Sequence, residues 1–247
     1  MWTPGAPGKL SAGVVIRARN EARYIGETLA AILDPAALQP RQVVVVDSGS
    51  TDGTLPIVRR FPTQLIEIRP EAFTYGSALN LGVARCDADI VVSLSAHSTP
   101  VGPDWLRCLL EPFANQRVAG VYGRQLPRAN ATPLELLGMW LSGVLSDRPT
   151  LLDRRPLFSN ANGAFRRALW EEFPFDQQVA GAEDVAWART MQQYGYHSHA
   201  EPLIQHLRRT RRDIPTILGN LLRLGSGEPG RVPLARQRQH GAGLTPP

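Results

Sequence analysis

Short apolar runs rich in β-branched residues alternate with helix-type segments through the first half of the chain. The strands that this pattern predicts are Val14–Ile16, Val43–Val46, Gln64–Ile68 and Ile90–Leu94. The helices predicted between them are Tyr24–Leu33, Thr54–Phe61 and Ser77–Ala84. Strands separated by helices are typical of a parallel sheet with helices on both faces. The first half therefore predicts a Rossmann-like α/β fold.

The second half has a less regular pattern. It predicts a helix over Asp104–Phe113, a strand over Val118–Tyr122, a loop and turn over Pro156–Arg167, a helix over Asp184–Tyr194 and a last short helix over Leu218–Leu224. Leu134–Leu145 is mostly apolar. Its length favours a core helix over a surface helix that touches lipid or an apolar acceptor.

Length and composition indicate a single large domain. The chain has 247 residues, of which 43% are hydrophobic and 20% charged, an ordinary globular balance. We expect a flexible N-terminus over residues 1–11, one α/β domain over residues 12–212, and a C-terminal helix with a disordered basic tail over residues 213–247.

The first residues lack the apolar core of a secretory signal, and no apolar stretch is long enough to span a bilayer. Cys86 and Cys108 do not form a disulfide framework, which favours a reducing cytoplasm.

The net charge of +5 is concentrated towards the C-terminus, where arginines recur between Arg208 and Arg238. Such a tail is either a solvated basic segment or a contact to the anionic surface of an inner membrane. No nucleic-acid recognition motif accompanies the arginines, so nucleic acid is not an expected partner.

Polar residues gather where the predicted strands end. The clusters are Arg17, Arg19, Asn20 and Glu21 after the first strand, Asp47 and Ser48 after the second, Ser95 and His97 after the fourth, and Asn160, Asn162 and Gly163 in a later loop. Ligands of open parallel sheets bind beyond the carboxyl ends of the strands. The first three clusters therefore predict a binding site, to which the later loop has to fold back.

Taken in order, the motifs resemble those of family 2 glycosyltransferases with the GT-A fold. The matching segments are Val14–Glu21, Asp47–Thr54, Gly76–Gly82 and Ala182–Asp184, within a region from about Val14 to His206. The resemblance implies a mostly parallel GT-A sheet flanked by helices, with a smaller acceptor-side half. It also implies an inverting enzyme that moves a sugar from a nucleoside diphosphate to an acceptor hydroxyl.

The resemblance also implies roles for single residues. Asp47 holds the nucleotide base, since a carboxylate accepts the imide N–H of uracil or thymine; the alternative is that Asp47 caps its own turn. Asp52 has the structural capping role. Asp184 is the catalytic base and Glu183 orients the loop or the acceptor, although two acids at a helix start also suit the helix dipole.

Further residues complete the implied nucleotide-sugar site. They are Arg17, Arg19, Asn20, Glu21, Ser48, Gly76, Asn80, Ser95, His97, Asn162 and Gly163.

One motif departs from the family pattern. Where the family has an Asp-x-Asp motif for ribose and a divalent metal, this chain has Ser95-Ala96-His97. Mn²⁺ suits this position better than Mg²⁺, because Mn²⁺ accepts an imidazole from His97 and a second one from His206. The alternative is that His97 contacts the diphosphate directly while Arg17 and Arg19 neutralise the leaving group without metal.

The substrates are less well defined. Asp47–Ser50 and Tyr122–Pro127 are similar to segments of bacterial rhamnosyltransferases, which implies a thymidine diphosphate deoxysugar as donor, with a uridine diphosphate sugar as the other candidate. The acceptor is expected to be a glycan or a lipid-linked intermediate of polysaccharide synthesis. A degenerate member that binds a nucleotide sugar without turnover is the alternative function. A nucleotidyltransferase is disfavoured, because no glycine-rich loop follows the first strand.

Overall fold

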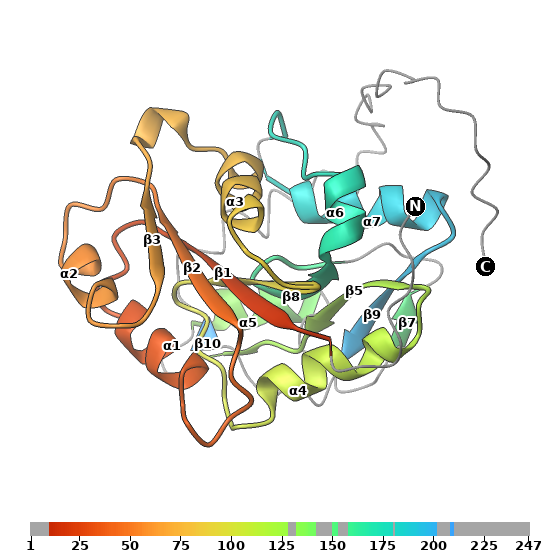
Figure 1. Cartoon of the computed structure of the whole chain (residues 1–247), viewed down its shortest axis with the longest axis horizontal. Helices are drawn as coiled ribbons and strands as arrows, with labels where there is room; N and C mark the ends of the chain where they lie inside the picture. Colours follow the sequence, from red (N-terminus) through yellow and green to blue (C-terminus); the bar gives the residue numbers. More distant parts are fainter. Residues whose placement is uncertain are drawn as a thin grey trace.

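A mixed sheet forms the centre of the computed structural model, which describes residues 10–127, 132–141, 150–152, 158–179, 181–201 and 208–209. Its eight strands lie in the order β3-β2-β1-β4-β8-β5-β9-β7 (Figure 1). The first four along the chain run parallel, and they are β1 (Ala12–Ala18), β2 (Gln42–Asp47), β3 (Gln64–Glu67) and β4 (Ile90–Ser95). The predicted Rossmann-like half is confirmed.

The other half of the sheet contains antiparallel pairs. Its strands are β5 (Val118–Gly123), β7 (Thr150–Leu152), β8 (Asn162–Arg166) and β9 (His197–Glu201). β8 runs antiparallel to both β4 and β5, β9 runs parallel to β5, and β7 closes the edge antiparallel to β9. The sheet is therefore mostly parallel with a smaller mixed half, as the GT-A resemblance implies.

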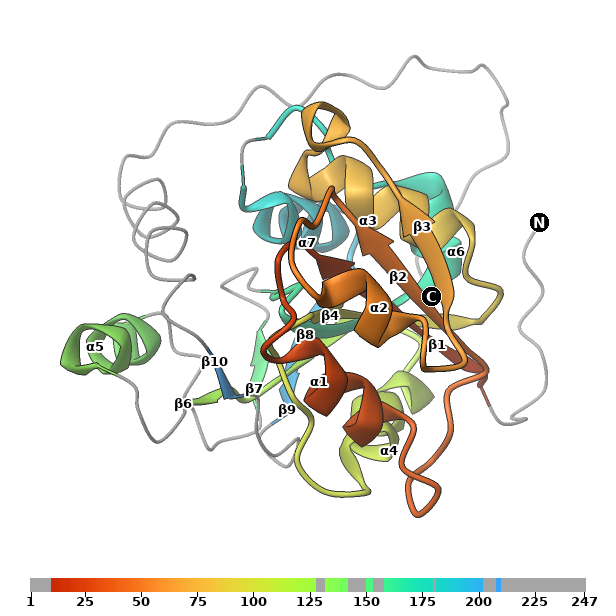
Figure 2. The ribbon, with the colours of Figure 1, turned by 90° about the vertical axis from the view of Figure 1, so that its left-hand side faces the viewer.

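Helices cover both faces of the sheet (Figures 1 and 2). One face carries α1 (Ile25–Ile32), α2 (Thr54–Val58) and α4 (Trp105–Leu110). The other carries α3 (Tyr75–Ala84), α6 (Arg167–Glu172) and α7 (Glu183–Gln193). Two short 3-10 turns, Pro70–Ala72 and Glu111–Ala114, complete these layers. Each layer buries one face of the sheet, which gives the molecule two hydrophobic cores.

The alternation of side chains along β1 decides where its polar end points. Val14 and Ile16 pack in the core under α1 and α4, whereas Val15 packs under α3. Successive side chains of a strand face opposite sides. Arg17 therefore lies on the side of α3 and α7, at the carboxyl end of the strand.

Two expectations about the second half are wrong. The predicted loop over Pro156–Arg167 contains β8, in which Ala164 and Phe165 are fully buried. This strand opens with Asn and Gly, so its apolar signal is too short to recognise. Its antiparallel direction brings Asn162 to the edge where β4 ends, since Asn162 pairs with Leu94.

The expected core helix over Leu134–Leu145 is a surface helix in the part that the structure describes, which ends at residue 141. α5 (Pro133–Leu141) exposes four large apolar side chains, those of Leu134, Leu136, Leu137 and Trp140. It packs beside the two-residue strand β6 (Leu126–Pro127), which pairs with β10 (Arg208–Arg209). A periodic apolar stretch of this length does not by itself say whether another layer covers it.

Some expectations concern residues outside the described ranges. They are the flexible residues 1–9, His206, the helix over Leu218–Leu224 and the basic tail after residue 212. Within the described ranges, no helix combines the length and apolar character needed to cross a bilayer.

Candidate active site

The turn after β1 is joined to the turn after β2. The backbone N–H of Asn20 donates to Ser50 Oγ (2.8 Å), and Asn20 Oδ1 accepts the N–H of Thr51 (2.8 Å). The N–H of Glu21 donates to Thr54 Oγ1 (2.7 Å). Asn20 has a φ of 55°, a left-handed conformation that asparagine adopts more readily than most residues. These bonds hold Glu21 at the carboxyl edge of the sheet.

Asp47 and Ser48 are engaged within their own turn. Asp47 Oδ1 accepts the N–H groups of Gly49 (3.0 Å) and Ser50 (2.8 Å), and its Oδ2 accepts the Ser50 hydroxyl. Ser48 donates through both its N–H and its hydroxyl to the carbonyl of Ala18. The structure thus shows Asp47 capping its turn, while its contact with a nucleotide base stays a prediction.

Asp52 has the structural role expected of it. Its Oδ1 accepts the N–H of Thr54 at the start of α2 (2.9 Å), and its Oδ2 accepts the N–H of Ala22 (3.2 Å). A side-chain oxygen that accepts backbone N–H groups at a helix start satisfies donors that the helix itself leaves unpaired.

The position of the family's Asp-x-Asp motif holds a histidine and carboxylate pair. His97 Nδ1 lies 3.1 Å from Glu21 Oε1, and both side chains are largely buried. A carboxylate at one ring nitrogen fixes the orientation of an imidazole. Among the described residues, no three His, Cys, Asp or Glu side chains converge. This part of the chain therefore does not offer Mn²⁺ a full set of protein ligands.

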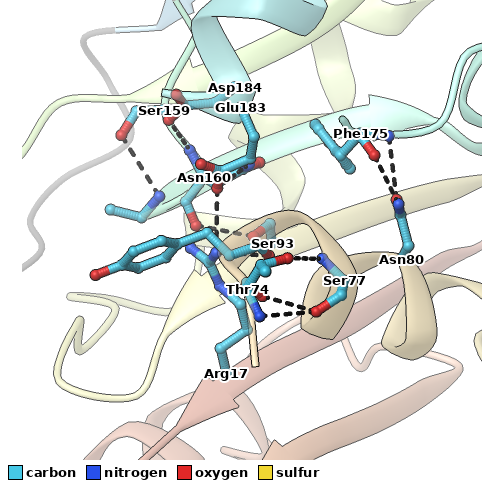
Figure 3. Close-up of polar contacts among 12 residues, drawn as sticks. Arg17, Thr74, Ser77, Asn80, Ser93, Ser159, Asn160, Phe175, Glu183 and Asp184 are labelled. Atoms are coloured by element: carbon cyan, nitrogen blue, oxygen red, sulfur yellow. Dashed lines mark hydrogen bonds and ion pairs between the residues drawn. The ribbon is translucent and has the colours of Figure 1, made fainter. Parts of the chain in front are cut away.

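Glu183 forms a buried ion pair with Arg17 (Figure 3). Glu183 Oε1 lies 3.1 Å from Arg17 Nη1 and accepts Asn160 Nδ2 (3.2 Å). Arg17 Nη1 also donates to the carbonyl of Tyr75 (3.1 Å), and its guanidinium carbon lies 5.1 Å from the centre of the Tyr75 ring. The positive charge of Arg17 is thus paired with the Glu183 carboxylate, whereas the side chain of Arg19 is exposed to solvent.

Asp184 is held at the first turn of α7, beside Glu183. Its Oδ2 accepts the N–H of Asn160 (3.1 Å), and its Oδ1 accepts the N–H of Val185 (2.8 Å). Burial, and next the negative charge of Glu183, raise the pKa of Asp184 to about 6, although the two hydrogen bonds and Arg17 oppose the shift. A carboxylate with a pKa near neutrality suits a general base, because it is ionised at pH 7 and still binds a proton.

The turn that presents this acid pair is strained. Gly181 has a φ of 106° and Ala182 a φ of 66°. An alanine in this region costs about 1 kcal/mol or more, because its Cβ crowds the backbone. Strain of this kind persists where the surrounding contacts hold the turn in place. Here the contacts of Glu183 with Arg17 and of Asp184 with Asn160 hold both acids at the sheet edge.

Two residues implied in nucleotide-sugar binding have packing roles. The Asn80 amide donates to the Phe175 carbonyl (2.7 Å) and accepts both the Phe175 N–H (3.1 Å) and Trp170 Nε1 (2.7 Å). A Cβ on Gly76 would lie 2.4 Å from the Asp176 carbonyl oxygen. Both positions fasten α3 to the segment after α6, so we leave them out of the proposed binding site.

Asn162 and Gly163 also face the protein. Asn162 Oδ1 accepts Trp105 Nε1 (3.0 Å) on the α4 side of the sheet. A Cβ on Gly163 would lie 2.5 Å from the Ser159 carbonyl oxygen, so this glycine permits a close approach within the chain. Asn160 contacts both members of the acid pair, and the sequence places it in the loop without giving it a role of its own. Its contacts are with residues more than twenty positions away, so local pattern carries no signal for them.

The raised pKa of Asp184 predicts a pH-dependent cost in stability. The folded state binds the Asp184 proton more tightly than the unfolded state, so this carboxyl stabilises the fold below about pH 4 and loses that contribution as the pH rises to about 6. We expect Asp184→Asn to raise the free energy of unfolding by about 1–3 kcal/mol above pH 6, with the gain shrinking towards pH 4.

Urea denaturation of both proteins across this pH range measures the difference. Asp104→Asn is the control, since its side chain is 66% exposed. A gain that does not change with pH would contradict the burial of an ionised Asp184.

Comparison with known proteins agrees with this arrangement. The family model described as "Glycosyl transferase family 2" matches residues 13–171. The O-antigen chain rhamnosyltransferase RfbN of Salmonella typhimurium is 30% identical over 181 residues, covering 68% of this chain and 58% of the relative. WbaN of Salmonella anatum, also an O-antigen chain rhamnosyltransferase, is 32% identical over 167 residues, 64% of this chain and 53% of the relative. The chain thus spans little more than half the length of these curated relatives.

Solved structures support the fold. The mannosyltransferase PcManGT from Pyrobaculum calidifontis, in complex with GDP-Man and Mn²⁺, superposes with a TM-score of 0.65 at 24% identity, covering 88% of this chain and 65% of that one. S. aureus TarS 1-349 in complex with UDP-GlcNAc gives a TM-score of 0.63 at 15% identity, over 84% and 61% of the two chains. With the family model matching most of the sheet and the acid pair seated at its edge, the chain belongs to glycosyl transferase family 2.

Proposed function

We propose that this protein is an inverting glycosyltransferase with Asp184 as the catalytic base. The observation that carries the proposal is the placement of the Asp184 carboxylate, which Asn160 holds at the sheet edge beside the ends of β1 and β4. Burial at this place raises the pKa of Asp184 to about 6. Family membership supports the same activity.

The reaction follows from this placement. The acceptor hydroxyl gives its proton to Asp184 while its oxygen attacks the anomeric carbon on the face opposite the nucleoside diphosphate. The new C–O bond forms as the bond to the diphosphate breaks, and the diphosphate leaves with the electron pair. Glu183, held by Arg17 and Asn160, acts as a positioning residue for the turn.

The substrates are proposed from the relatives. Both Salmonella proteins are O-antigen chain rhamnosyltransferases. We infer that this chain transfers rhamnose from a thymidine diphosphate donor, with a uridine diphosphate sugar as the alternative, to a polysaccharide intermediate. A cytoplasmic site of action is part of the proposal, and it agrees with a sequence that has only two cysteines, Cys86 and Cys108, both of them buried.

Replacing the base separates an enzyme from a binder without turnover. We expect Asp184→Asn to reduce the release of dTDP from dTDP-L-rhamnose by about 10²–10⁴-fold, with simple methyl glycosides as acceptors, while dTDP affinity changes less than about threefold. The wild-type rate should rise with pH to a plateau with an apparent pKa near 6, because the base acts when ionised. Equal turnover in both proteins would remove Asp184 from the mechanism, and absent turnover with intact dTDP binding in the wild type would favour the degenerate binder.

For the leaving group, we propose direct contact between His97 and the diphosphate. Glu21 orients the His97 ring. The two residues before His97 are Ser95 and Ala96, so neither provides a carboxylate for a metal, and no cluster of metal ligands occurs among the described residues. The alternative is that His97 is one ligand of Mn²⁺, with His206 from outside the described residues.

Calorimetric titration with dTDP decides between these two roles. We expect His97→Ala to weaken dTDP binding about tenfold, which is about 1.4 kcal/mol. We expect a chelator or added Mn²⁺ to change wild-type affinity less than about threefold. Loss of wild-type binding on chelation would instead place the metal at His97.

We further propose that α5 rests on the surface of an anionic membrane. Trp140 is 68% exposed, Leu134 55% and Leu137 51%, an apolar surface of the kind that inserts at a lipid interface. β6, beside which α5 packs, pairs with the arginine strand β10.

Flotation with liposomes tests this contact. We expect the full chain to float with vesicles that contain phosphatidylglycerol and much less with phosphatidylcholine alone, because the arginines favour anionic lipid. Leu137→Ser combined with Trp140→Ser should reduce flotation at least about fivefold, since each serine removes buried apolar area. Arg59→Ser, a surface change at the far edge of the sheet, is the control; equal flotation of both variants would exclude α5 as the contact.

A further inference from the structure

Two buried amide oxygens, one on Asn160 beside the acid pair and one on Gln125, have no hydrogen-bond donor among the described residues. Gln125 lies between β5 and β6 and is fully buried; its Nε2 donates to Ser159 Oγ (3.1 Å), but its Oε1 has no partner among the described residues. Asn160 is 1% exposed; its Nδ2 donates to Glu183 Oε1, but its Oδ1 likewise has no partner there. Buried polar atoms without partners are few in native proteins, so two of them in one hydrogen-bonded loop at the acid pair point to a ligand.

The two oxygens belong to one connected network. Gln125 bonds the side chain of Ser159, the residue before Asn160, and Asn160 bonds both Glu183 and Asp184. Figure 3 shows Asn160 between the acid pair and Ser93, whose hydroxyl donates to the Asn160 carbonyl (2.8 Å). Asn160 is therefore held directly beside the carboxylate that we propose as base, and Gln125 is joined to this loop through Ser159.

The chemistry of these oxygens selects the ligand. An amide oxygen only accepts hydrogen bonds, so its partner has to donate. A diphosphate has no proton to offer at neutral pH and would be repelled by these oxygens and by the two neighbouring carboxylates. Sugar hydroxyls donate, and a sugar presents several of them close together.

We propose that Gln125 and Asn160 form a sugar-hydroxyl subsite beside Asp184 and select which hydroxyls the sugar carries. This inference rests on the proposed function and extends it to the specificity of the site. The hydroxyls belong either to the sugar being transferred or to the acceptor, since both meet at the base. A site built to bond a hydroxyl rejects the analogue without it, because the buried oxygen is then left unpaired.

Gln125→Met is the first test, because methionine keeps the length of the side chain and removes its polar atoms. Thr63→Val is the matched control: Thr63 Oγ1 is also buried with no partner in the part of the chain that the structure describes, but Thr63 lies before β3, away from the acid pair. We expect both variants to keep wild-type affinity for dTDP within about threefold. Gln125→Met alone should lose about 10- to 100-fold in turnover of dTDP-L-rhamnose with methyl glycoside acceptors.

Deoxy analogues show which sugar is recognised. If the donor sugar is recognised, wild-type turnover falls at least about tenfold for one monodeoxy dTDP-rhamnose, and Gln125→Met shows no such preference. If the acceptor is recognised, the same pattern appears with monodeoxy methyl glycosides and not with the donor analogues.

The experiment also separates this inference from the proposed function. Turnover by Gln125→Met equal to that of Thr63→Val, together with no loss on any deoxy analogue by the wild type, would overturn the subsite and leave the enzyme intact. The wild-type analogue series decides the question even where a variant does not fold. A wild-type protein that binds no dTDP or UDP sugar would overturn both the function and the subsite.

Discussion

The ion pair between Arg17 and Glu183 joins the central strand of the parallel sheet to the first residue of α7. Both side chains are largely buried, with 14% and 4% of their surface exposed. A buried pair is stable only when further hydrogen bonds compensate for lost solvation, and here the Tyr75 carbonyl and Asn160 Nδ2 provide them. Because Asp184 follows Glu183 directly, this contact also sets the position of the proposed base.

The site combines stabilised and destabilised parts. The turns after β1 and β2 are tied together by hydrogen bonds that satisfy their backbone N–H groups. The acid pair, in contrast, follows a left-handed alanine, consists of two neighbouring carboxylates and contacts Asn160, whose amide oxygen has no donor among the described residues. Each of these features lowers the stability of the protein alone. A proton relieves the repulsion between the two carboxylates, and a hydroxyl-bearing ligand would provide the amide oxygen with a donor. The destabilising features therefore lie at the residues to which we assign the function.

Local patterns predicted one half of the molecule better than the other. The four valines of β2 and the Asp-Ser-Gly-Ser-Thr-Asp turn after it are local signals, and the structure has both where expected. β8 was missed because its first residues, Asn162 and Gly163, are typical of a turn, and its partners β4 and β5 form it. The apolar residues of α5 indicated a helix correctly but wrongly indicated burial, which depends on whether another layer covers them.

The order of motifs along the chain by itself determined the family, the parallel half of the sheet and the edge at which polar residues gather, because strand ends and turns are local properties. Tertiary structure alone decided the partners and the chemistry of those residues. Arg17 and Glu183 are 166 positions apart, and Asn160 reaches Asp184 only because β8 runs back along β4. The pKa of Asp184 depends on burial and on neighbouring charge, which exist only once the chain has closed around it.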